Sequence, residues 1–402
     1  MLDRGCDLNH VCRGDGVLFV RDGVGLAGRG TIARTDGTGA ASLLAAVTRD
    51  PRSDGDDRPG AGPVLLGLVP FLPDGESEFI LPRLVIAKHD DGTATATLVA
   101  ADPDGLSDDA MTAAIDEAVS TGPPRPATNS YRVLQRTSTA RYLDAVVAAR
   151  DAVRSGEIAK AVIARDIEVF ADDPIDIHAV LLRLRASFGS SYRYCVGNMI
   201  GASPELLVAV EGRAVHSHPL AGTAPRTGDP ATDERLAADL IASTKNQVEH
   251  RVVIDMVRDT LLPRCSYLDW EAEPSVVAVA NVQHLGTEIR GALTEPVPPV
   301  LDLVADLCPT PALGGHPGAA AIELIGRLEA SPRGHYGGAV GWLDAHGNGT
   351  FAVTIRCAEL SPDRRSARLF AGGGIVAESD PHAELAETQA KFQAMLSAIV
   401  RP

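Results

Sequence analysis

Three charged residues near the C-terminus, Glu384, Glu387 and Lys391, stand at positions i, i+3 and i+7 and therefore share one stripe of a helix. A solvated face with an ordinary Glu–Lys pair explains such a stripe when it stands alone. Here a glycine run at 372–374 precedes it, and glycines let backbone amides approach a bound carboxylate closely. Together with Arg356, these groups predict a small site for an anionic ligand beside two carboxylates.

Glu249 stands beside the apolar stripe of a second predicted helix, where a carboxylate is costly unless it is paired or bound to a metal. A lone glutamate at such an edge usually just reaches toward solvent. Two glutamates from different helices, however, suit Mg²⁺, which takes one or two carboxylates, several waters and a substrate oxygen. Lys160 and Glu205 have no local pattern that indicates catalysis, and their spacing alone predicts surface residues.

The bulk composition excludes several classes of partner. A formal charge of −16 repels nucleic acid and anionic membranes, so an anionic substrate needs a local cationic site. The apolar runs are too short to span a membrane, and the N-terminus lacks the apolar segment of a secretion signal. Six cysteines are scattered without a C-x-x-C pair, which argues against zinc or disulfides. We therefore expect a cytoplasmic protein with no nucleic-acid or membrane partner.

The elements that must position these residues follow from hydrophobic periodicity and capping. Short strand-like runs separated by Gly and Asp in the first 120 or so residues predict hairpins. Helices and hairpins are mixed in the rest, which predicts an α+β fold. The individual predictions are a helix at 139–154, a strand at 161–170, a helical stretch at 233–262 broken near 243–246, a hairpin of strands 337–343 and 350–360 with Arg356 on the face opposite Phe351, Val353 and Ile355, and a helix from Pro381 to Val400 with Asp380 as N-cap.

The motif G-x-G-x-x-G occurs at residues 23–28, directly after a strand-like run. A dinucleotide site needs a helix N-terminus at this point to hold the pyrophosphate, and no helix is predicted there. We therefore interpret the motif as a glycine-rich hairpin turn.

Taken in order, the segments that carry these residues resemble the chorismate-utilising enzymes, which include isochorismate, salicylate, anthranilate and aminodeoxychorismate synthases. The matches span nearly all of residues 130–395, whereas the front part of the chain matches weakly. The matching segments are KAVIARD (160–166), GASPELL (201–207), PLAGTAPR (219–226), KNQVEHR (245–251), QHLGTEIRG (283–291), PTPALGG (309–315), RGHYGGAVGW (333–342), TIRCAEL (354–360) and AGGGIVAESDPHAELAETQAK (371–391).

The resemblance implies one large α+β chorismate-binding-enzyme fold. Two big, mainly antiparallel sheets would pack face to face, with helices outside. Residues 121–130 have the composition of a linker. Residues 1–128 are accordingly expected to form the N-terminal part of the fold and residues 129–402 its catalytic region, within one integrated domain.

The resemblance also implies a division of roles among the candidate residues. Glu249 and Glu387 would hold Mg²⁺ with help from Glu384. Lys160 would act as the general base for an attacking water and Glu205 as the general acid, which requires a neutral amine and a protonated carboxyl. The remaining residues implied to contact chorismate are His284, Ala312, Leu313, Tyr336, Arg356, Gly372, Gly373, Gly374 and Lys391.

Within this family the nucleophile separates the branches. Aminating members use a glutaminase with a cysteine nucleophile, and no cysteine here lies in a G-x-C-x-G-like elbow. The segment PTPALGG and Lys160 both resemble the water-using, isochorismate-forming members. We therefore expect a monomeric isochorismate synthase, an isomerase without a glutaminase subunit. A salicylate synthase, an aminating synthase and a non-catalytic chorismate-binding homologue are the alternatives, and the sequence leaves open whether the product enters menaquinone or siderophore biosynthesis.

Overall fold

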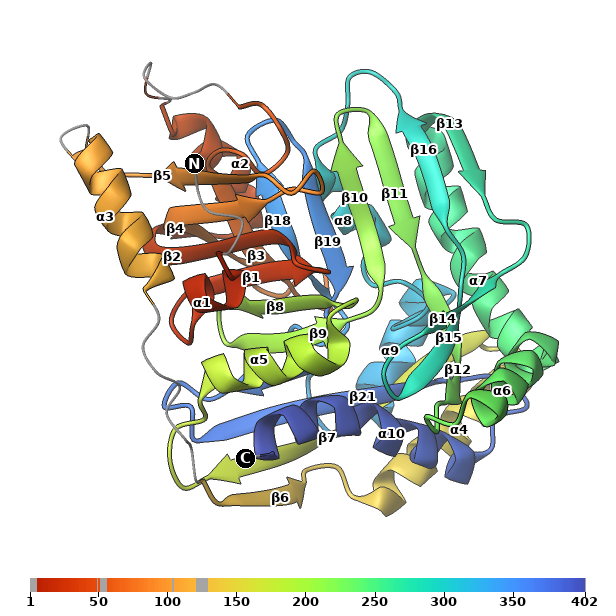
Figure 1. The fold of residues 1–402 in the computed structure, drawn as a ribbon. Coiled ribbons are helices and arrows are strands. Elements are labelled where there is room, and N and C mark those ends of the chain that lie inside the picture. Colours follow the sequence, from red (N-terminus) through yellow and green to blue (C-terminus); the bar gives the residue numbers. More distant parts are fainter. Residues whose placement is uncertain (1–5, 49, 51–55, 103–104, 121–128, 402) are drawn as a thin grey trace.

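The computed structural model describes residues 6–48, 50, 56–102, 105–120 and 129–401 (Figure 1). Most of the predicted linker at 121–130 lies outside these residues. The proposed boundary between a front and a back part therefore remains a prediction.

Most of the described strands belong to one hydrogen-bonded network of 18 strands. Neighbours along its main path pair antiparallel. In the order of pairing, this path is β13 (Cys265–Trp270), β16 (Ile289–Leu293), β11 (Ala214–His218), β10 (Leu206–Glu211), β19 (Gly349–Val353), β18 (Ala339–Asp344), β3 (Val64–Val69), β4 (Glu78–Lys88), β2 (Val24–Thr35), β1 (Val17–Arg21), β8 (Tyr192–Val196), β9 (Met199–Ser203), β20 (Cys357–Leu360), β21 (Ser366–Ile375), β7 (Lys160–Ala171) and β6 (Tyr131–Gln135).

Two short strands extend the network and three form a separate sheet. Strand β5 (Ala94–Leu98) pairs with β4, and β17 (Gly315–His316) pairs with β7. The separate sheet has the order β12 (Leu220–Pro225), β15 (Val282–Gly286) and β14 (Ser275–Ala278). The predicted α+β class with mainly antiparallel strands is confirmed. The two expected big sheets are joined into one network, however, because the pairings β1–β8, β8–β9 and β9–β20 continue the ladder from one layer into the other.

Helices lie around the strands, with α10 alongside β21 and β7 and the pair α6–α7 beside the small sheet (Figure 1). None of the helices in the described residues is long and apolar enough to cross a membrane. The helices are α1 (Leu8–Cys12), α2 (Gly37–Ala46), α3 (Asp108–Val119), α4 (Thr139–Arg154), α5 (Ile177–Phe188), α6 (Pro230–Ala242), α7 (Thr244–Leu261), α8 (Val300–Leu307), α9 (Gly318–Leu328) and α10 (Pro381–Val400).

The predicted helix at 139–154 and the predicted start of the last helix are confirmed. Helix α4 has the predicted bounds, and α10 begins at Pro381, where the Asp380 side chain accepts a hydrogen bond from the amide of Ala383. The predicted break in the stretch 233–262 is also confirmed. Ser243 ends α6 and caps α7, accepting from the Asn246 amide.

The predicted uninterrupted strand at 350–360 is wrong. Strand β19 ends at Val353 and β20 begins at Cys357, each with different neighbours. Arg356 lies between them with a φ of 52°, in the left-handed region and far from the extended conformation of a regular strand. Its side chain is therefore set by a turn, and the expectation that strand alternation orients it is wrong as well.

The G-x-G-x-x-G segment is a hairpin turn, as predicted. Arg21 pairs with Val24 across a turn in which Asp22 and Gly23 both have positive φ. Strand β2 then continues through the rest of the motif, so no helix N-terminus faces a phosphate there.

The largest buried apolar cluster joins distant parts of the strand path. It contains Leu65 of β3 and Phe351 of β19, and also Ile163 of β7 and Ile375 of β21. Because one core includes both pairs of strands, the strand ends and turns that carry polar residues are held close together. The candidate site lies at such a place.

Candidate active site

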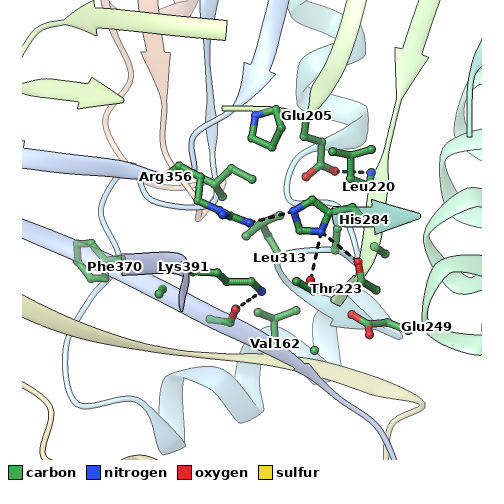
Figure 2. Close-up of a pocket in the computed structure, with 18 of the residues that line it drawn as sticks. Val162, Glu205, Leu220, Thr223, Glu249, His284, Leu313, Arg356, Phe370 and Lys391 are labelled. Atoms are coloured by element: carbon green, nitrogen blue, oxygen red, sulfur yellow. Dashed lines mark hydrogen bonds between the residues drawn. The ribbon is translucent and has the colours of Figure 1, made fainter. Parts of the chain in front are cut away.

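One pocket collects most of the predicted residues (Figure 2). Its walls come from β7, β21, α7, α10, the small sheet and the turn after β19. Four predicted residues do not line it. Lys160 and Glu387 contact the lining residues Glu249 and Lys391, Gly373 lies between two lining glycines, and Glu384 lies behind Gly373. The predicted residues in the lining are Glu205, Glu249, His284, Ala312, Leu313, Tyr336, Arg356, Gly372, Gly374 and Lys391.

Arg356 and His284 point toward each other in the pocket (Figure 2). Nη2 of Arg356 donates to Nε2 of His284 at 3.0 Å, and Nδ1 of His284 donates to the carbonyl of Gly222 at 3.0 Å. Burial, followed by the charges of Arg356 and Lys391, lowers the pKa of His284 to about 3, so the imidazole is neutral. His284 therefore orients Arg356 as well as lining the pocket.

Arg356 keeps one donor free for a ligand. Its Nη1 is buried and has no hydrogen-bond partner, although burial of the whole guanidinium lowers its pKa. The turn behind it is fixed, because the hydroxyl of buried Tyr194 donates to the carbonyl of Ile355 at 3.1 Å. An unpartnered, oriented guanidinium in a pocket is suited to an anionic group.

Glu205 follows strand β9 and is 3% exposed. Its Oε1 accepts a long hydrogen bond of 3.4 Å from the Leu220 amide. Burial raises the pKa of Glu205 to about 7, against the opposing effects of that amide and of the charges of Lys160 and Arg356. The side chain therefore holds a proton over much of the neutral range, as a general acid must.

Lys160 opens strand β7 and is fully buried, contrary to what its spacing alone predicted. Its Nζ lies 3.1 Å from Oε1 of Glu249, which comes from α7. Gly374 allows this approach: a Cβ at that position would stand 2.2 Å from Oε1 of Glu249 and 2.9 Å from Cε of Lys160. Because Gly374 has no side chain, the Lys160–Glu249 pair packs directly against the backbone of β21.

The glycine run lies inside β21, paired with β7 from Gly372 opposite Ala164 to Gly374 opposite Val162. The pairing of β20 with β21 stops at Leu369, so no described strand covers the other edge of the run. That open edge favours the predicted contact between glycine amides and a ligand carboxylate.

Two glutamates of α10 lie behind this run. Oε1 of Glu384 accepts from Nζ of Lys245 at 2.7 Å and from Oγ of Ser379 at 2.8 Å. Burial and the charge of Glu387 raise the pKa of Glu384. Glu387 pairs with Lys391 at 2.6 Å. Burial acts to raise the pKa of Glu387, but the charge and hydrogen bond of Lys391, together with the effects of Lys245 and His284, lower it. Lys391 also donates to the carbonyl of Gly372 at 2.7 Å.

The three predicted metal ligands offer suitable chemistry without a closed cage. Among the described residues, no three His, Cys, Asp or Glu side chains are close enough to hold an ion. Carboxylate oxygens are nevertheless the donors that Mg²⁺ prefers, and Oε2 of Glu384 is buried without any partner. The donor chemistry of Glu249, Glu384 and Glu387 therefore fits Mg²⁺, although their carboxylates do not converge on one point.

Sequence reasoning missed two residues that support this site. Lys245 lies one helical turn before Glu249 and contacts Glu384. Arg333 is buried, pairs with Glu329, and donates to the carbonyls of Leu313 and Val162 at 2.7 Å each. Both residues open segments that were matched to the family, KNQVEHR and RGHYGGAVGW, so their position in those segments was the available signal.

Comparisons with known proteins agree with this arrangement. The chorismate binding enzyme family matches residues 35–400. A Mycobacterium tuberculosis protein named isochorismate synthase MenF is 41% identical over 355 residues, covering 85% of this chain and 88% of its own. A Halobacterium salinarum anthranilate synthase component 1 is 35% identical over 345 residues, covering 82% of this chain and 65% of its own.

A solved structure extends the likeness to the whole fold. The crystal structure of the 2,3-dihydroxybenzoate-specific isochorismate synthase DhbC from Bacillus anthracis superposes with a TM-score of 0.80 at 30% identity, covering 97% of this chain and 98% of that one. Sequence, fold and pocket lead to the same assignment, and the chain belongs to the chorismate-binding enzyme family.

Proposed function

We propose that this protein is a magnesium-dependent isochorismate synthase, a cytoplasmic isomerase that interconverts chorismate and isochorismate without a glutaminase subunit. The observation that carries the proposal is the presence of two buried groups able to transfer protons, one in the lining of the pocket and one directly behind it. Lys160 is a fully buried amine at one side, and Glu205 is a buried carboxyl whose pKa is about 7. A water nucleophile needs both a base and an acid of this kind.

Lys160 and Glu205 divide the proton transfers between them. Lys160 removes a proton from water as its oxygen bonds to C2 of the ring. The ring double-bond electrons shift, the bond from C4 to its hydroxyl breaks, and Glu205 gives its proton to the departing oxygen, which leaves as water. Protons and electrons balance without a redox partner, which is consistent with an isomerase.

The remaining residues bind and orient the substrate. Arg356, held by neutral His284, receives the enolpyruvyl carboxylate through its free Nη1, and the buried Tyr336 hydroxyl stands nearby as a neutral donor because burial raises its pKa. Ala312 and Leu313 form the apolar part of the lining. Mg²⁺, held by Glu249 and Glu387 with Glu384, would supply positive charge for the ring carboxylate.

The test is proton NMR of chorismate with purified protein and Mg²⁺, without ammonia, beside an identical sample containing EDTA. A mixture of chorismate and isochorismate that forms only with the metal supports the proposal. Pyruvate with salicylate would instead make this a salicylate synthase. Turnover that begins only when ammonia is added would overturn the choice of water as nucleophile.

A further inference from the structure

Each predicted metal ligand is paired with its own lysine. The pairs are Glu249 with Lys160 at 3.1 Å, Glu384 with Lys245 at 2.7 Å, and Glu387 with Lys391 at 2.6 Å. Each carboxylate thus already has an amine partner before any metal arrives. Each carboxylate is drawn toward its lysine, which accounts for the absence of a closed three-carboxylate cage among the described residues.

Lys245 differs from the other two lysines because no role in the reaction is implied for it. It does not line the pocket, and its partner Glu384 is only 1% exposed. Its Nζ lies 2.7 Å from Oε1 of Glu384, and the charges of Glu249 and Glu387 also act on it. A divalent ion bound by Glu384 would therefore lie close to this ammonium and be repelled by it.

One carboxylate oxygen of Glu384 remains free to bind a cation. Its Oε1 is used twice, by Lys245 and by Ser379. Its Oε2 is buried and has no partner, although an unsatisfied buried carboxylate oxygen is costly. A cation that contacts Oε2 would remove this cost.

We propose that Lys245 is the internal counter-cation of the metal site: its ammonium neutralises the carboxylates in the metal-free enzyme and weakens divalent-metal binding by charge competition. The inference rests on the proposed magnesium requirement and adds a residue that sets metal affinity. The Lys245 ammonium thereby offsets negative charge when no metal is bound, and it repels Mg²⁺ when the ion binds.

The test compares Mg²⁺ binding to the wild type and to Lys245→Met by isothermal titration calorimetry. The measurement is made at pH 8, because Glu384 without its lysine partner is less easily protonated at this pH. We expect Lys245→Met to bind Mg²⁺ about tenfold more tightly or better, because a unit charge a few ångströms from a divalent ion has at least that effect. Lys245→Arg keeps the charge and is expected to bind within a few-fold of the wild type. Ser379→Ala removes the other bond to the same oxygen without changing charge, and is expected to leave Mg²⁺ affinity unchanged or weaker.

Thermal unfolding gives an independent readout. Without metal, Lys245→Met should melt below the wild type, because Glu384 loses its partner. At a fixed Mg²⁺ concentration it should gain more in Tm than the wild type, since stabilisation grows with affinity. If Lys245→Met does not fold, Lys245→Gln carries the same expectations.

The outcomes separate the two proposals. Weaker or unchanged Mg²⁺ affinity in the neutral variants means that Lys245 only supports Glu384, and overturns this inference while the metal site stands. A wild type that shows neither heat of binding nor a Tm shift with Mg²⁺ overturns the metal proposal and this inference together.

Discussion

The two sides of the pocket are prepared for a ligand in different ways. The arginine side, Arg356 with His284 and Glu205, contains one cation with a free donor, a neutral imidazole and a carboxyl that holds a proton. On the carboxylate side, Glu249, Glu384 and Glu387 each contact the amine of a lysine. The side chains of the arginine side are already oriented before a ligand binds. The glutamates of the carboxylate side must exchange their lysine partners for the metal. An acidic protein can therefore bind an acidic substrate, because its anchor is oriented in advance and its carboxylates are paired with lysines.

The largest effect should come from removing one proton-transfer group from either side. Lys160→Ala and Glu205→Gln are each expected to lower turnover by about two orders of magnitude or more, the usual contribution of a general base or acid. Chorismate turnover followed by NMR measures this, with circular dichroism to check the fold. Glu157→Gln, an exposed glutamate of the same charge, is the matched control. Near wild-type turnover in either variant would remove that residue from the mechanism.

A smaller effect is expected when the anchor of the arginine side is removed. Arg356→Met should raise the KM for chorismate by about thirtyfold or more, since losing one partner of a buried charged contact costs at least about 2 kcal/mol. Arg365→Met removes an exposed arginine outside the pocket and should leave KM unchanged. Steady-state kinetics distinguish the two, and a normal KM in Arg356→Met would place the substrate carboxylate elsewhere.

The mildest perturbation is a change of pH, which tests the arginine side without mutation. The pKa of Glu205 is about 7, above its usual value, so the protonated acid is complete well below pH 7 and is lost as pH rises through it. We expect kcat/KM to fall about tenfold per pH unit above that value. Thermal unfolding over the same range separates loss of the proton from loss of the fold. A flat profile to pH 9 would contradict the assignment of Glu205 as the acid.

The same burial of Glu205 has a consequence for stability. An acid whose folded pKa lies above its unfolded value contributes stability below the unfolded value and loses it as pH rises to the folded one. The window in which this stability is lost therefore runs from the usual carboxyl pKa of 4.5 up to about 7. Binding of a substrate that accepts its hydrogen bond would offset this effect.

Local signals predicted much of the fold. The break between α6 and α7 and the start of α10 follow from Ser243 and from Asp380 with Pro381, because capping depends on neighbouring residues only. The left-handed turn at Arg356 was missed, since it is held by the Tyr194 hydroxyl and the different partners of β19 and β20. No local pattern encodes such contacts.

The candidate site shows the same limit. Lys160 has the spacing of a surface residue, and only segments distant in sequence bury it: His316 of β17 pairs with it, β21 ends opposite the next residue, and Glu249 comes from α7. Family resemblance supplied its role, and the glutamates and Arg356 were found together in the pocket region that this resemblance implies. Lys245 was not proposed, because a lysine one turn from a glutamate on a helix looks like an ordinary ion pair. Its contact with Glu384 of α10 is visible only in the folded structure.

The three adjacent glycines of β21 differ sharply in how much change they tolerate. At Gly372 an added methyl group would stand 3.1 Å from the Ile163 carbonyl oxygen, a tight but adjustable fit. At Gly373 it would stand 2.7 Å from Oε2 of Glu384, whose other oxygen is held by Lys245 and Ser379. At Gly374 it would stand 2.2 Å from Oε1 of Glu249 and 2.9 Å from Cε of Lys160. Of the three positions, Gly374 therefore excludes a side chain most strictly, because a methyl group there would displace the proposed base together with its carboxylate partner.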